Sequence, residues 1–208
     1  MYKDAIDQAN LRLEKAQSAL ADLEAANTLI AVEKAWSDYL IAVAGIYGKL
    51  EQGSKGFGKS EAWFGRKKIE RKSDPTLEYL HQARNADEHG IAHGIDAVET
   101  IHVIFVKNGE NWDILSTIYV SSIDGEKSRL NNDANVEVRD KDGNLVEIQT
   151  VITHAVQLLK VKNRGKFFQP PEIFSGNRII DKSPLGVARL CYPFFNQLLR
   201  DATKFVEN

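Results

Sequence analysis

The sequence predicts an α+β protein in which helices near both ends of the chain enclose a β-rich segment. Residues 3–26 and 28–52 carry apolar side chains at spacings of three and four, the pattern of amphipathic helices. Residues 98–170 instead alternate apolar and polar side chains between turn residues, which is typical of antiparallel hairpins. Helical spacing returns at 183–206. We therefore expect a helical bundle that is interrupted by a small antiparallel sheet.

This pattern divides the chain of 208 residues into two expected parts. Residues 1–97 and 183–208 form the bundle, and residues 98–182 form the β-rich insertion. Hydrophobic residues make up 43% and charged residues 27%, which is ordinary for a soluble protein with a core. The single cysteine, Cys191, excludes an internal disulfide and favours a reducing, cytoplasmic location. No apolar run reaches the roughly 18 residues that a membrane span needs, so no membrane role is expected.

Local signals mark where each helix begins or ends. Asn27 and Thr28 separate the first two helices, which are expected to form a helical hairpin. Asp74 can accept hydrogen bonds from the first free amides of a third helix, and Pro75 fits its first position. Ser183 and Pro184 begin the last helix in the same way.

Three turns are expected to divide the β-rich segment into hairpins. The first turn is Asn108-Gly109, the strongest short hairpin signal in the chain. The second lies at 141–144 and the third at 163–165. Pro170-Pro171 then ends the sheet. The paired runs are 101–105 with 114–120, 136–139 with 145–148, and 156–161 with 166–168.

A glycine-rich stretch matches the phosphate-binding pattern G-x-x-x-x-G-K-S. Its fixed positions are Gly53, Gly58, Lys59 and Ser60. That motif works only where a buried strand feeds the loop and a helix leaves it, so that backbone amides surround the phosphates. Here the preceding residues complete a helix. We interpret the stretch as a connection and keep nucleotide binding as a minor alternative.

The segment 53–73 holds seven lysines and arginines against two glutamates, with Trp63 and Phe64 between them. Clustered cations beside aromatic rings are typical of surfaces that hold single-stranded nucleic acid. The other interpretation is a solvated helix whose Trp63 packs inward. The residues expected to contact nucleic acid are Lys59, Trp63, Arg66, Lys67 and Arg71.

The third helix carries the residues with the clearest chemistry. Asn85 and His89 are four positions apart and share a face, and the long side chain of Arg84 can reach the same groove. A guanidinium is a charged fork for phosphate, and an imidazole titrates near neutral pH. Together they predict a site that cleaves phosphodiesters.

The run Arg84-Asn85-Ala86-Asp87-Glu88-His89 resembles the R-N-x-x-x-H signature of the HEPN superfamily. The resemblance covers only the helical part of the chain. It implies a four-helix up-and-down bundle and a metal-independent endoribonuclease without a cofactor, in a toxin–antitoxin or phage-defence system. It also implies that His89 is the acid or base, that Arg84 binds the scissile phosphate, and that Asn85 orients one of them.

The resemblance further implies a homodimer, in which two motif helices share one cleft, with RNA as substrate and an antitoxin as a further partner. The alternative is a non-catalytic dimeric bundle that serves as an interaction module. A metal site built from His89 and His93, with Glu88 or His81, is disfavoured because Gly90 separates the two histidines.

Overall fold

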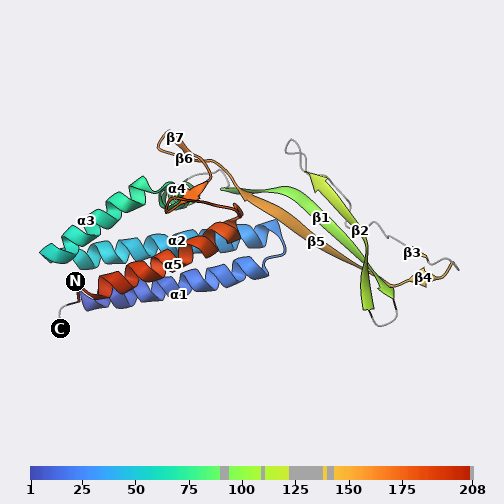
Figure 1. Cartoon of the computed structure of the whole chain (residues 1–208), viewed down its shortest axis with the longest axis horizontal. Helices are drawn as coiled ribbons and strands as arrows, with labels where there is room; N and C mark the ends of the chain where they lie inside the picture. The colour runs from blue at the N-terminus through green and yellow to red at the C-terminus, as the bar shows by residue number, and fades with distance from the viewer. Residues whose placement is uncertain (90–93, 109–110, 122–137, 140–142, 207–208) are drawn as a thin grey trace. The chain divides into compact units, whose positions relative to one another are not determined.

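The computed structural model confirms the α+β class. It describes residues 1–89, 94–108, 111–121, 138–139 and 143–206 (Figure 1). These residues form five helices and nine strands. The chain divides into two compact units, which we call the helical unit and the sheet unit. The helical unit is Met1–Ala26, Ile30–Asp96 and Gln157–Asn208, and the sheet unit is Ala97–Val156 with Asn27–Leu29.

Two long helices open the helical unit, as expected. They are α1 (Lys3–Ala25) and α2 (Leu29–Ser54), and the predicted break falls between them. The buried face of α2 supplies much of the core, with Tyr39, Ile46 and Leu50 fully buried. The end of α2 lies so close to α1 that a Cβ on Gly53 would stand 2.3 Å from the Cβ of Ala5. Glycine is needed at position 53 because any larger side chain would push the helices apart.

A third helix, α3 (Gly58–Ser73), occupies most of the basic segment. The described residues therefore form five helices, where the sequence predicted four long ones. The inward face of α3 is formed by Ser60, Trp63 and Phe64. Gly58, at the first position of α3, belongs to the stretch that we interpreted as a connection. Glycine is tolerated there because the first backbone amides of a helix have no partner within the helix.

The next helix, α4 (Pro75–His89), begins as predicted. One carboxylate oxygen of Asp74, Oδ1, accepts hydrogen bonds from the backbone amides of Thr76 at 2.9 Å and Leu77 at 3.1 Å. Pro75 occupies the first helical position, where its missing N–H costs nothing. Gly90, the residue after the last one of this helix, lies outside the described residues.

The last helix, α5 (Pro184–Thr203), also begins at its predicted cap. The Ser183 hydroxyl accepts a hydrogen bond from the Gly186 amide at 3.0 Å. Figure 1 shows α5 alongside α1, and the two helices are joined by an ion pair of 2.9 Å between Arg189 and Glu24. The apolar stripe of α5 is therefore buried within the helical unit, as its sequence predicted. The buried members include Val187, Ala188, Cys191, Phe195, Leu198 and Leu199.

Four short strands belong with the helices, although the sequence placed all of 98–182 in the insertion. They are β6 (Val161–Asn163), β7 (Lys166–Phe168), β8 (Ile173–Phe174) and β9 (Asn177–Arg178). Two hydrogen bonds from α4 hold this region: the Tyr79 hydroxyl donates to the Leu159 carbonyl at 2.6 Å, and the Thr76 hydroxyl donates to the Ile173 carbonyl at 2.7 Å. Contacts between residues so distant in sequence leave no local pattern.

The sheet unit contains a three-stranded sheet in the order β2-β1-β5. The predicted first hairpin is confirmed, because β1 (Ile95–Asn108) and β2 (Asn111–Ser121) pair antiparallel from Glu99↔Ser121 to Asn108↔Asn111. The third strand is β5 (Ile148–Leu158). In the second hairpin, β3 (Val138–Arg139) pairs with β4 (Leu145–Val146). The expected positions 136–137 and 141–142 lie outside the described residues.

The close approach of α1 and α2 gives a first prediction. Gly53→Ala should lower the free energy of unfolding by about 1–3 kcal/mol, because the added methyl group overlaps Ala5. Urea denaturation followed by circular dichroism measures the change. The control is Gly48→Ala in the same helix, where a Cβ meets nothing within 4 Å and alanine should stabilise by about 0.5–1 kcal/mol. Equal effects of the two substitutions would contradict the packing argument.

Candidate functional site

The three motif residues lie on the last turns of α4. Arg84 and Asn85 have half-buried side chains, and the helix ends at His89. The side chain of His89 lies outside the described residues. The structure therefore brings Arg84 and Asn85 together, while the place of the imidazole stays a prediction.

The guanidinium of Arg84 is held by two residues of its own helix. Its Nη1 donates to the Asn85 side-chain oxygen at 3.2 Å, and its Nη2 forms an ion pair of 2.6 Å with Glu88. The Arg84 side chain is 30% exposed, and its Nε has no hydrogen-bond partner among the described residues. An ion pair of this spacing contributes about 0.3–0.5 kcal/mol, so a phosphate can compete with Glu88 for the guanidinium.

The acidic residues beside the motif both have partners. Glu88 pairs with Arg84, and Asp87 accepts a hydrogen bond from the Ser37 hydroxyl of α2. Two carboxylates beside the motif could repel a phosphate. These interactions reduce that repulsion, because part of the negative charge is already paired or hydrogen-bonded.

His81 belongs to the same network, which the sequence analysis missed. Its Nε2 lies 3.4 Å from the side-chain nitrogen of Asn85, one helical turn away. Burial lowers the pKa of His81, and the positive charges of Arg71, Arg84 and Lys72 lower it further, against the opposing effect of Glu78. The ring is therefore neutral at pH 7 and can accept a hydrogen bond from Asn85. The spacing of four residues between His81 and Asn85 was the signal that could have indicated this pair.

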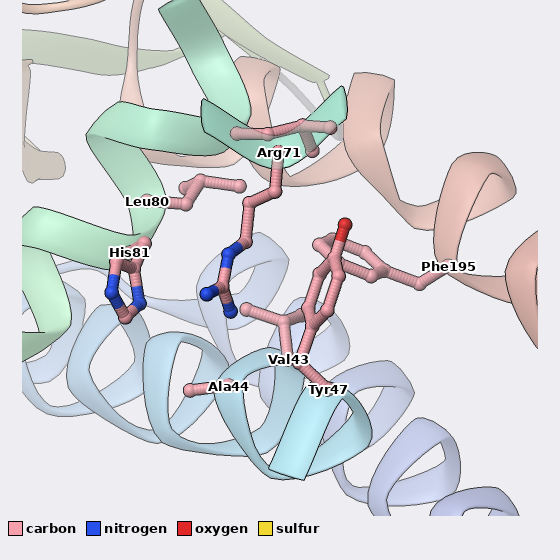
Figure 2. Close-up of a pocket in the computed structure, with 8 residues that line it drawn as sticks. Val43, Ala44, Tyr47, Arg71, Leu80, His81 and Phe195 are labelled. Atoms are coloured by element: carbon pink, nitrogen blue, oxygen red, sulfur yellow. The ribbon is translucent and has the colours of Figure 1, made fainter. Parts of the chain in front are cut away.

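A small pocket opens beside His81, between α2, α3, α4 and α5 (Figure 2). Figure 2 shows the Arg71 guanidinium between the His81 ring and the face of Tyr47, and its central carbon lies 4.5 Å from the centre of the Tyr47 ring. The pocket volume of about 20 Å³ fits a water molecule and excludes a nucleotide. The lining residues are Val43, Ala44, Tyr47, Arg71, Leu77, Leu80, His81 and Phe195.

Arg71 was expected to contact nucleic acid directly, but it stacks inside the protein. Its side chain is half-buried over the Tyr47 ring, and its Nε has no hydrogen-bond partner among the described residues. Stacking over an aromatic ring stabilises a cation that lacks an acidic partner. Arg71 therefore contributes first to the packing of α3 on α2.

The other predicted nucleic-acid contacts have three different surroundings. Lys59 and Arg66 are exposed, and neither forms an ion pair within the described part of the chain. Lys67 pairs with Glu70 at 2.7 Å. Trp63 is 7% exposed and packs against Phe205, with ring centres 5.4 Å apart, so its ring is covered by the core and does not face solvent for base stacking. The inward-packing interpretation holds for Trp63.

The stretch that resembles a phosphate-binding loop has a different structure. Gly53 lies inside α2 and Gly58 begins α3, so a helix leads into the stretch where the motif requires a strand. The Ser60 hydroxyl donates within the stretch, to the carbonyls of Phe57 at 3.1 Å and Ser54 at 3.3 Å. Close packing on Ala5 explains Gly53 without a nucleotide.

Within the described ranges, no three or more histidine, cysteine or acidic side chains gather as metal ligands, and His93 lies outside those ranges. Among the helices that the structure describes, none combines the length and the apolar character that crossing a bilayer requires. Cys191 is fully buried, and burial raises the pKa of its thiol, which argues against a nucleophilic role.

No protein-family model, curated protein or solved structure matches this chain.

The environment of His81 gives a second prediction. Its pKa in the folded state lies below the unfolded value of about 6.5, so protons bind preferentially to the unfolded chain as the pH falls below that value. The free energy of unfolding should therefore fall more between pH 7.5 and 5.5 in the wild type than in His81→Gln. Urea denaturation at both pH values measures this difference. An equal loss in both proteins would show that His81 is not shielded from solvent.

Proposed function

We propose that this protein is a metal-independent endoribonuclease of HEPN type that acts as a cytoplasmic homodimer, with α1, α2, α4 and α5 as its four-helix bundle. One observation carries the proposal. Arg84 and Asn85 are hydrogen-bonded to each other near the end of α4, one turn before His89, and the other partner of the guanidinium among the described residues is Glu88, in a surface ion pair.

The proposed chemistry follows from these groups. A ribose 2′-oxygen attacks the adjacent phosphorus while the bond from phosphorus to the 5′-oxygen breaks. The reaction moves one proton off the 2′-hydroxyl and supplies one to the leaving 5′-oxygen, and His89 performs one of these transfers. The guanidinium of Arg84 leaves Glu88 and stabilises the charge that grows on the phosphate oxygens. Asn85 orients the guanidinium through its hydrogen bond.

A second copy of the chain completes this scheme. One imidazole cannot be base and acid in the same step, so the other transfer needs a second proton carrier. A second α4 facing the first would supply the same residue from the partner. A toxin–antitoxin or phage-defence system suits such an enzyme, because an antitoxin that covers the shared cleft would block both halves at once.

A non-catalytic interaction module is the second candidate. The observation that favours it is the 2.6 Å ion pair between Arg84 and Glu88, which already satisfies much of the guanidinium without a ligand. In that case the Arg84–Asn85–His81 network serves to fix the end of α4.

The third prediction tests the cleavage directly. Purified protein should cut single-stranded RNA in EDTA, and His89→Ala and Arg84→Ala should each lose about 100-fold or more of that activity. Arg189→Ala is the control, because Arg189 of α5 forms a comparable surface ion pair with Glu24 of α1. Equal activity of all four proteins would identify the cleavage as a contaminant and remove the assigned roles.

The fourth prediction separates the two candidates through Glu88. If Arg84 binds substrate, Glu88→Gln should lower KM for RNA, because the competing carboxylate is lost. The free energy of unfolding should change by only about 0.3–0.5 kcal/mol. Steady-state kinetics and urea denaturation provide the two measurements. A marked loss of stability together with unchanged KM would favour the interaction module.

A further inference from the structure

The β6–β7 hairpin carries the densest exposed positive charge of the helical unit outside α3. Residues 157–171 contain no acidic residue. They contain four cations, whose side chains are all exposed and form no ion pair with any described residue. These cations are Lys160, Lys162, Arg164 and Lys166.

An aromatic ring stands in the middle of these charges. Phe167 pairs with Lys162 across the hairpin and is 59% exposed. The ammonium groups of Lys160 and Lys162 lie 5.4 and 5.5 Å from the centre of its ring. The opposite face of the hairpin is anchored in the protein, since Val161 is 4% exposed. The hairpin thus presents a fixed ring and cations to solvent on one side.

The turn of this hairpin keeps a cation at a strained position. Arg164 has φ of 47° and Gly165 has φ of 80°, the left-handed pair of a two-residue hairpin turn. Asparagine is the favoured residue at the first of these positions, and arginine is uncommon there. A residue that adopts an unfavourable backbone conformation without improving the packing indicates a role for its side chain.

Side-chain hydrogen bonds fasten the hairpin to α4. The Asn163 amide donates to the Gln82 side-chain oxygen at 2.6 Å, and Gln82 in turn donates to Glu78 at 2.8 Å. The hairpin is therefore fixed to the helix that carries Arg84. A hollow of about 450 Å³ lies beside Phe167 and is lined also by Lys72, Tyr79 and Pro170. This volume is within the range of pockets that hold small organic ligands.

We propose that the β6–β7 hairpin and this hollow form a binding platform for single-stranded nucleic acid. A base stacks on Phe167, and backbone phosphates contact Lys160, Lys162 and Arg164. Stacking on an aromatic ring within a cationic surface holds unpaired bases of any sequence, whereas a duplex keeps its base faces covered. The platform goes beyond the proposed cleavage, because binding here needs neither Arg84 nor His89.

The fifth prediction measures binding without cleavage. The probe is a fluorescent 2′-O-methyl oligouridine of about 12 nucleotides, which lacks the 2′-hydroxyl that cleavage requires. By fluorescence anisotropy with the full chain, Phe167→Ala should weaken binding at least about fivefold, and Phe167→Tyr should retain it. Arg164→Asn removes the charge while keeping a turn-forming residue, and it should lower the slope of log K against log salt concentration by about 0.7.

The matched control is Arg189→Gln, which removes an exposed cation that pairs with Glu24 of α1 and does not line the hollow. Thermal unfolding by circular dichroism verifies that each variant is folded. The platform is overturned if Phe167→Ala binds as wild type, if the control weakens binding as much as Arg164→Asn, or if a duplex of equal length binds as tightly. Retention of anionic vesicles but not of the oligonucleotide would also overturn it. Loss of cleavage in the EDTA assay with binding intact would count against the nuclease proposal alone.

Discussion

The carboxylate of Asp74 is the interaction on which the rest of the helical unit depends. One of its oxygens caps α4, and the other accepts a hydrogen bond from the Ser175 amide at 2.9 Å in the turn between β8 and β9. Next to it, the fully buried Thr76 donates to the Ile173 carbonyl. The start of α4 is thus fixed to a segment a hundred residues away. Because a helix is stiff over a few turns, fixing its start also fixes the positions of His81 and Arg84.

Beyond this fixed start, the side chains of α4 have different neighbours on different faces of the helix. His81 lines the small pocket together with Arg71 and Tyr47 of the neighbouring helices, Gln82 holds the β6–β7 hairpin, and Arg84 remains partly in solvent. Asn85 connects two of these surroundings, because it lies between His81 and Arg84. One helix of 15 residues therefore organises the small pocket, the hairpin and the motif. The arrangement explains why so many polar side chains occur in a helix that is otherwise part of the core.

The sequence predicted features that depend on a few neighbouring residues. The caps at Asp74 and Ser183 and the hairpin around Asn108 are local, so their signals were sufficient. Trp63 was ambiguous because a ring that stacks on bases and a ring that packs inward look alike in the sequence until the partner of the ring, Phe205, is known. The sequence placed 157–182 in the insertion, whereas these residues group with the helical unit, where the hydrogen bond from Tyr79 to Leu159 joins residues 80 positions apart. The role assigned to the side chain of His89 rests on the sequence pattern alone.

The backbone at Arg164 has a consequence for how the hairpin can vary. The same residue sets the geometry of the turn and supplies one of the outward charges. Asparagine would relax the chain but remove a cation, and glycine would do the same at a greater entropic cost. No natural L-amino acid at this turn position therefore gives both an unstrained backbone and a positive charge.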